Sequence, residues 1–126
     1  MNKYSIDTAA SVIVLEVKLT ARSSAIGRFV LDTGASNIVL PWKLARAIGI
    51  MIDPDNMVHT TTATAVETVP EVVIPEVQVL GKSAKNVIGI IKDLPIEARV
   101  DGLLGLSFLR HFRLLVDFRD RFITLE

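Results

Sequence analysis

The chain has 126 residues, half of them hydrophobic, and its 14 basic and 14 acidic residues cancel in charge. This length is enough for one domain and too short for two ordinary ones, so residues 1–126 are predicted to form a single domain. The neutral balance gives no electrostatic footprint for nucleic acid or an anionic membrane surface, and the absence of cysteine excludes disulfides, thiolate nucleophiles and Cys-ligated metals.

The N-terminal segment lacks the long apolar core of a signal peptide, and no run of about 18 apolar residues could span a bilayer. By default we therefore expect a cytoplasmic protein with no membrane contact. Nothing in the composition calls for a nucleic-acid partner.

The first predicted elements are β-strands. Residues 12–19 begin as an apolar run and then alternate, as a strand does when it leaves a core for a half-exposed edge. Residues 23–27 contain two serines and a glycine that indicate a turn, and residues 29–31 open a second strand. Together they predict a hairpin that delivers Asp32.

Residues 41–49 are predicted to form a short helix. A proline near its first turn and a glycine just past its end are the usual start and stop signals. Within it, Trp42 is most simply a packing residue.

The segment 57–69 is rich in threonine and valine and is therefore inclined to β structure. Its small residues at 63–65 suit the tip of a hairpin. Pro70 and Pro75 bracket the apolar residues 72–74 and indicate an edge strand or a break there.

The last third of the chain predicts two hairpins around a short helix. Residues 77–80 and 86–91 flank a Gly-Lys turn, and residues 107–112 suggest one or two helical turns with Ser107 as a candidate N-cap. A final hairpin is expected on either side of Arg119-Asp120. Many short strands at this spacing predict a compact all-β barrel or sandwich with one or two short helices.

Asp32 is the strongest candidate for a residue that carries out chemistry. It follows the apolar run 29–31, and the motif Asp32-Thr33-Gly34 is succeeded by a second apolar run at 38–40. This order puts one carboxylate at the end of a buried strand, on a tight turn. Such a carboxylate is suited to acid/base chemistry if a second one can be brought beside it.

A second motif, Leu103-Leu104-Gly105 followed by Ser107-Phe108-Leu109, lies in the last quarter of the chain. With this pair of motifs the sequence resembles the retropepsin-like aspartic proteases, in particular the bacterial single-domain members. Residues 29–36 match the family's first motif at every defining position. The order and spacing of the two motifs agree, and the resemblance extends from about Val12 to the C-terminus.

The resemblance implies a mainly β fold, the closed acid-protease barrel with one or two short helices. It implies Asp32 as the catalytic residue, Thr33 and Gly34 as its scaffold, and support from Leu103, Leu104 and Gly105. Because the chain has one Asp-Thr-Gly, a protease of this kind must be a homodimer with Asp32 from each subunit. The two carboxylates share one proton and activate water, so no cofactor and no metal is expected.

The resemblance also implies that residues 60–67 form a flap over an extended peptide or protein substrate, which is bound by β-strand addition. The substrate-binding residues would be Ala35, Ser36, Thr62, Ala63, Thr64 and Ala65.

Two features depart from the family. The flap tip lacks glycine, so a turn that needs a positive φ is harder to form. The acidic residue and arginine that stabilise viral dimers are replaced by Ser36 and Leu106. The alternative of a catalytically silent peptide-binding or dimerisation module with the same fold therefore stays open, and Arg121 to Glu126 is a candidate dimer segment.

The remaining candidates favour structural interpretations. His59 and His111 are isolated and make a poor metal site. Asp101 is expected to be a loop residue, and Ser107 lacks the second glycine of a nucleophile elbow, which argues against a serine hydrolase.

Overall fold

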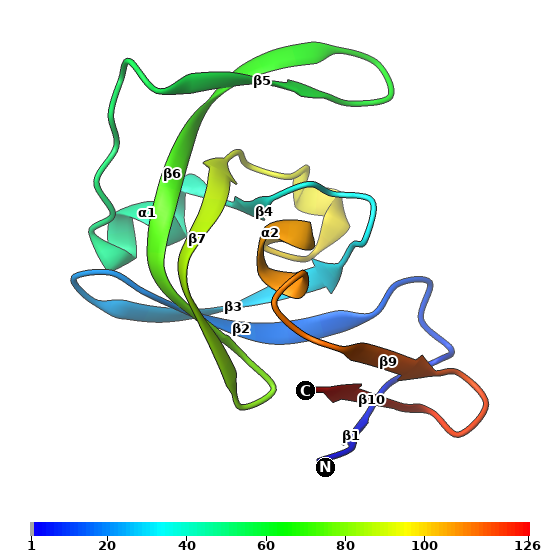
Figure 1. Ribbon diagram of the computed structural model, residues 1–126. Coiled ribbons are helices and arrows are strands. Elements are labelled where there is room, and N and C mark those ends of the chain that lie inside the picture. Colours follow the sequence, from blue (N-terminus) through cyan, green and yellow to red (C-terminus); the bar gives the residue numbers. More distant parts are fainter. Residues whose placement is uncertain (1) are drawn as a thin grey trace.

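The computed structural model describes residues 2–126 as ten strands, two α-helices and one 3-10 helix (Figure 1). The strands are β1 (Tyr4–Ser5), β2 (Val14–Thr20), β3 (Ser24–Leu31), β4 (Ile38–Leu40), β5 (Met57–Thr61), β6 (Val66–Val79), β7 (Lys82–Ile91), β8 (Gly102–Leu104), β9 (Leu114–Asp117) and β10 (Phe122–Leu125). The helices are α1 (Trp42–Ile48), η1 (Ile96–Ala98) and α2 (Leu106–Leu109).

Seven strands form one sheet in the order β2-β3-β8-β4-β7-β6-β5, and an additional pairing of β2 with β6 closes it into a barrel. β5 lies outside the closed part. The prediction of a mainly β, closed barrel with short helices is confirmed. Within residues 2–126, no helix is both long and apolar enough to cross a membrane.

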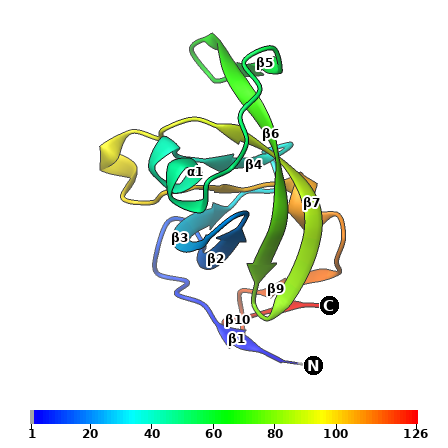
Figure 2. The same ribbon diagram turned by 90° about the vertical axis from the view of Figure 1, so that its left-hand side faces the viewer.

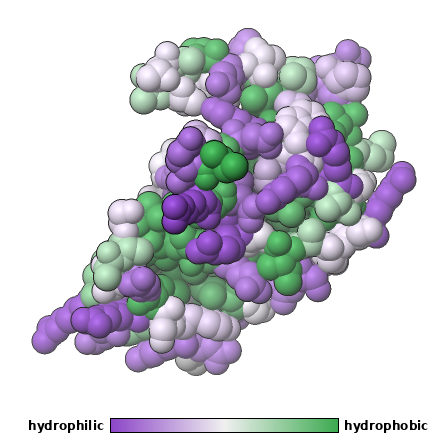
Figure 3. Space-filling model, turned by 180° about the vertical axis from the view of Figure 1, so that it is seen from behind, coloured by the Kyte–Doolittle hydropathy of each residue, from purple (hydrophilic) through white to green (hydrophobic). Residues whose placement is uncertain are grey.

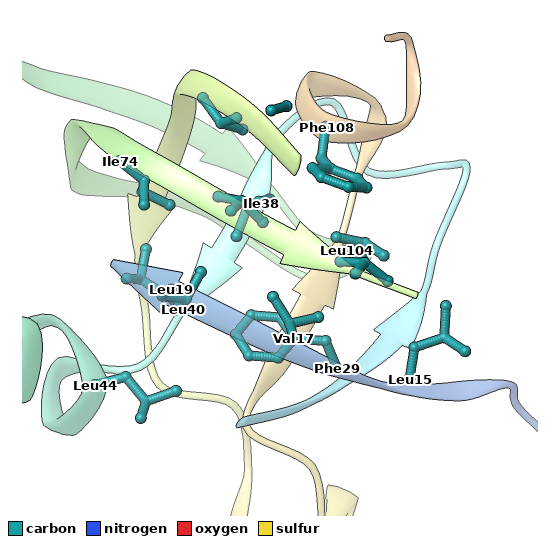
Figure 4. Packing of buried hydrophobic residues seen from close by; sticks show 14 of the residues in the cluster. Leu15, Val17, Leu19, Phe29, Ile38, Leu40, Leu44, Ile74, Leu104 and Phe108 are labelled. Atoms are coloured by element: carbon teal, nitrogen blue, oxygen red, sulfur yellow. The ribbon is translucent and has the colours of Figure 1, made fainter. Parts of the chain in front are cut away.

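The barrel closes around side chains that alternate along β2. Leu15, Val17 and Leu19 are buried, whereas Glu16 and Lys18 between them are exposed, as the period of a half-buried strand requires. β2 pairs in antiparallel register with β3. The apolar face meets side chains from β3, β4, β8 and α2 in one core (Figure 4).

α1 begins and ends where the sequence predicts. Pro41 is its N-cap residue, and Gly49 takes the left-handed conformation with φ +67°. The amide of Gly49 donates to the carbonyl of Arg46, and that of Ile50 to Ala45, which satisfies the last turn of the helix.

β6 continues through both prolines, so of the two alternatives predicted for residues 72–74 the break is wrong and the edge strand agrees with the structure. Pairing with β5 ends at Pro70 and pairing with β2 begins at Glu76, so the prolines lie where one side of β6 changes partner. A missing amide donor is tolerated there. The part of β6 that pairs with β5 projects beyond the barrel, and we call residues 57–70 the arm (Figure 2).

Ser107 is not a helix cap, contrary to the prediction. The N-cap residue of α2 is Gly105, and no side chain caps the helix. The buried Ser107 hydroxyl instead donates to the carbonyl of Ile88 (2.7 Å) and accepts from the amide of Ile38 (2.9 Å). It thereby joins α2 to β7 and β4.

The two ends of the described chain meet in a three-stranded sheet, in the order β1-β10-β9. β10 is its central strand, with Ile123 paired to Tyr4 on one side and to Val116 on the other. The segment Arg121 to Glu126, a candidate dimer segment, is paired with β9 along the whole of β10, whereas on its other side β1 pairs only with Phe122 and Ile123.

Candidate active site

Asp32 lies immediately after the last residue of β3, at the start of a loop that leads to β4. Its amide donates to the carbonyl of Leu104 (3.1 Å), and its own carbonyl accepts from the amide of Ala35 (3.2 Å). The side-chain oxygen Oδ1 accepts from the amide of Gly34 at 2.9 Å. Two backbone hydrogen bonds thus hold the residue, and a third orients its half-buried carboxylate.

The second motif supports this loop from behind. β8 lies between β3 and β4, parallel to β3 and antiparallel to β4 at the pair Val39 and Leu103. The amide of Leu106 donates to the carbonyl of Ala35 (2.8 Å), and that of Ser107 to Ser36 (2.9 Å). The predicted neighbourhood of the two motifs is therefore present in the fold.

Gly105 is the point of closest approach between the second motif and the Asp32 loop. A methyl group on its Cα would collide with the carbonyl oxygens of Ala35 and Asn37. Only glycine fits at this position without a shift of the loop.

A cleft of about 560 Å³ opens above Asp32, between the barrel and the arm. In the space-filling view from behind, the arm overhangs the body with an open notch beneath it (Figure 3). The cleft is lined by Asp32, Gly34, Ala35, Ser36, Asn37, Val39, Val58, His59, Thr60, Thr61, Thr62, Ile90, Lys92, Leu94 and Leu103.

Not all of the predicted site residues line this cleft. Asp32, Gly34, Ala35, Ser36, Thr62 and Leu103 do. Thr33 is exposed in the Asp32 loop, and Leu104 and Gly105 are buried behind it. Residues 63–65 are exposed at the tip of the arm and lie outside the lining.

The tip of the arm forms a turn without glycine. The Thr62 hydroxyl accepts hydrogen bonds from the amides of Ala65 (3.1 Å) and Thr64 (3.4 Å), and the amide of Thr62 donates to the carbonyl of Ala65 (2.8 Å). None of residues 62–65 has a positive φ. A threonine side chain closes this turn, so the absence of glycine does not prevent a hairpin.

The cleft has an apolar part at the base of the arm, and the sequence analysis did not predict these apolar residues. Val58 and Val69 of the arm pack with Val39, Ile90, Leu94 and Leu103 of the barrel as a second, smaller hydrophobic cluster. The residues come from five separate segments, so their proximity depends on the barrel closure.

An ion pair joins the arm to the barrel beside this cluster. Lys92, just after β7, lies with its Nζ 3.1 Å from Oε2 of Glu67 on the arm. The Lys92 side chain is 21% exposed and that of Glu67 is 47% exposed. A surface pair of this kind contributes little to stability, at most about 1 kcal/mol, but it fixes where the two side chains lie.

Asp101 bridges three elements away from the cleft. Its carboxylate accepts from the amide of Arg28 (2.8 Å) and lies 2.9 Å from Nζ of Lys43, while its amide donates to the carbonyl of Arg28 (2.7 Å). Partial burial raises the pKa of Asp101, but the hydrogen bonds and charges of Arg28 and Lys43 outweigh it and hold that pKa below its usual value. The surroundings of Asp101 therefore favour its ionised carboxylate.

The histidines have different surroundings. His59 lines the cleft, and its Nδ1 lies 3.1 Å from the hydroxyl of Thr68 on the neighbouring strand. His111 lies with its ring against Phe112, with 6.3 Å between ring centres. Across residues 2–126, no group of three or more His, Cys, Asp or Glu side chains is placed to hold a metal ion.

Comparison with known proteins points in one direction. Residues 24–111 match the model of a family described as gag-polyprotein putative aspartyl protease. A retropepsin-like aspartic protease from Rickettsia conorii has a similar crystal structure, with a TM-score of 0.69 and 23% sequence identity over 98% of this chain and 90% of that one. At this identity the similarity concerns the fold. A search of curated proteins found no match.

Proposed function

Because the chain belongs to the family of gag-polyprotein putative aspartyl proteases, we propose that it is an aspartic endopeptidase in which Asp32 activates a water molecule for peptide-bond hydrolysis. One observation carries the proposal above all others. Asp32 lies at the floor of a cleft that the arm covers, with its carboxylate oriented by the amide of Gly34.

The chemistry requires a second carboxylate, which we propose comes from a second copy of the chain. Among the described residues that line the cleft, Asp32 is the one acid. Two carboxylates about 3 Å apart cannot both ionise, so they hold one proton between them. The ionised carboxylate removes a proton from water, and the protonated one donates a hydrogen bond to the scissile carbonyl.

A two-fold axis beside the Asp32 loop would bring both copies of Asp32 together, since an isologous interface places equivalent residues at its axis. The surface next to this loop is consistent with such an interface. Thr33 is exposed in the loop, and Leu106, which follows the second motif, leaves 37% of its surface exposed. In the dimer, Thr33 would reach the opposite loop and stiffen the pair of carboxylates.

The substrate would be an extended peptide between the Asp32 loop and the arm. β5 is the edge strand of the seven-stranded sheet, so it has a free edge for main-chain hydrogen bonds. Alternate side chains of the peptide would enter the apolar cluster around Val39, Ile90 and Leu103. The arm, acting as the flap, would exclude water from the reacting bond.

The test is cleavage of an unbiased peptide mixture, read by mass spectrometry between about pH 4 and pH 7, the range in which a shared proton can serve catalysis. Wild type and Asp32→Asn would be compared, because asparagine keeps the size and the acceptor for Gly34. We expect cuts from wild type and a loss of at least about 100-fold in the variant. Peptides that bind without being cut at any pH would favour the silent binding module.

Dilution provides a second, independent test of the proposal. If each site needs two copies of Asp32, activity per subunit must fall when the protein is diluted below its dimer dissociation constant. Sedimentation measured over the same concentrations should show the dimer dissociate in parallel. Constant activity per subunit in a protein that sediments as a monomer would contradict the shared site.

A further inference from the structure

A pocket of about 560 Å³ is formed by α1 and the segment that joins β7 to β8. Its lining residues are Pro41, Trp42, Lys43, Arg46, Asp93, Leu94, Pro95, Ile96, Arg99, Val100 and Asp101. We call it the Arg46–Arg99 pocket. Leu94 is the one described residue that it shares with the lining of the Asp32 cleft, and none of its charged residues belongs to that lining. The charges of this pocket therefore act on a surface apart from the cleft.

The charged side chains of the pocket leave two arginines without an acidic partner. Lys43 and Asp101 form an ion pair, with Nζ 2.9 Å from Oδ1. Asp93 accepts a hydrogen bond from the first backbone amide of α1 (3.0 Å). Arg46 and Arg99 are exposed, and within residues 2–126 neither takes part in an ion pair. With three basic and two acidic side chains in its lining, the pocket has a net positive charge.

Arg46 is positioned by an aromatic neighbour. Its guanidinium lies 5.4 Å from the centre of the Trp42 ring, in a cation–π contact. This contact restricts the arginine side chain but does not use its N–H donors. A guanidinium presents these donors as a planar fork, which binds a carboxylate through two parallel hydrogen bonds. The pocket thus offers a preorganised group for a carboxylate ligand.

An apolar surface lies beside the arginines. Ile96 of η1 is 89% exposed, the largest exposed fraction among the large hydrophobic residues that the structure describes. Pro95, which precedes it, is exposed as well. Covering such apolar area is favourable. A small anion held by the arginines would leave Ile96 uncovered, whereas a peptide with acidic and apolar side chains would contact both.

We propose that the Arg46–Arg99 pocket is a docking site for an acidic segment of a partner protein, in which aspartate or glutamate residues flank an apolar residue. The carboxylates would pair with the two guanidiniums, and the apolar side chain would pack on Ile96. Charge complementarity determines the choice of partner, since the arginines would repel a basic segment. The proposal depends neither on Asp32 nor on cleavage.

The experiment is a calorimetric titration of the protein with a short capped peptide that has glutamates on both sides of one leucine. Two comparison peptides carry glutamine in place of glutamate, or glycine in place of leucine. We expect the glutamine peptide to bind at least roughly tenfold more weakly, and the glycine peptide to bind several-fold more weakly. Added salt should weaken binding of the glutamate peptide, because the arginines are exposed.

Variants on both elements of the pocket locate the site. Arg46→Glu and Arg99→Glu should each weaken binding of the glutamate peptide at least about tenfold. Arg99→Glu should also strengthen binding of a peptide with lysines in place of the glutamates, a gain that requires a folded protein. Ile96→Ser should remove the preference for leucine over glycine. Arg119→Glu is the matched control, because it makes the same charge change at an exposed arginine outside the pocket and should alter none of these affinities.

Two results would overturn the docking site. Equal weakening by Arg119→Glu and Arg99→Glu would show that the peptide responds only to the overall charge. Weakening by Lys92→Gln, with binding unchanged in both pocket arginine variants, would place the peptide in the Asp32 cleft, which Lys92 lines. Asp32→Asn should bind the glutamate peptide as tightly as wild type does. The docking site and the proposed protease activity can therefore fail independently of one another.

Discussion

The amide of Asp32 donates a hydrogen bond to the carbonyl of Leu104, 3.1 Å away, across the parallel pair of β3 and β8. The candidate catalytic residue is thus held by a strand from the opposite end of the chain. Its position depends on the second motif as much as on its own loop.

Gly105→Ala should therefore disturb the Asp32 loop. The added methyl group collides with the carbonyl oxygens of Ala35 and Asn37, and overpacking of this kind typically costs about 1–3 kcal/mol. Urea unfolding should show that loss, and peptide cleavage should fall with it. A variant with wild-type stability and activity would show that the loop moves aside freely.

Ser107→Ala should destabilise the fold by about 1–3 kcal/mol, because it leaves the amide of Ile38 and the carbonyl of Ile88 without their buried partner. Thermal unfolding measures the effect. Ser83→Ala is the control, since Ser83 is an exposed residue of β7 and its loss should be nearly neutral. Equal unfolding temperatures for the two variants would contradict the bridging role of Ser107.

Asp101→Asn should lower stability by about 1 kcal/mol at neutral pH, because it removes the charge that faces Arg28 and Lys43. The pKa of Asp101 is depressed in the folded protein, so its stabilising effect is present above the unfolded-state pKa. It is lost as the pH falls through the folded-state pKa. Unfolding curves of wild type and variant should converge in strong acid, and a difference that grows with acidity would contradict this assignment.

Thr62→Ala should loosen the tip of the arm without affecting the core. The variant loses the acceptor for the amides of Thr64 and Ala65, and the tip is otherwise exposed. Hydrogen exchange at Ala65 should accelerate several-fold while the unfolding temperature stays constant. Thr64→Ala is the matched control, and it should leave that exchange rate unchanged.

The sequence predicts those parts of the site that depend on local signals. Asp32 follows an apolar strand and precedes a glycine, so its place at a strand end can be read directly. Pro41 and Gly49 mark the ends of α1 in the same way. The pairing of the two motifs followed from the family resemblance.

Features that depend on closure of the barrel could not be predicted. Pro70 and Pro75 leave an edge strand and a break equally open, and the choice depends on β6 exchanging β5 for β2 at that point. Ser107 has the pattern of a helix cap, but its hydroxyl finds partners on two distant strands. The Lys92–Glu67 pair joins segments whose proximity has no local signal.

The insertion of β8 between β3 and β4 has a consequence for the order of folding. β3 ends at Leu31 and the strand that pairs beside it begins at Gly102, so about seventy residues of chain lie between them. Pairings between such distant segments form late because the intervening loop must first be closed. The Asp32 loop is therefore expected to take its final shape among the last parts of the barrel, after β8 has filled the gap beside it.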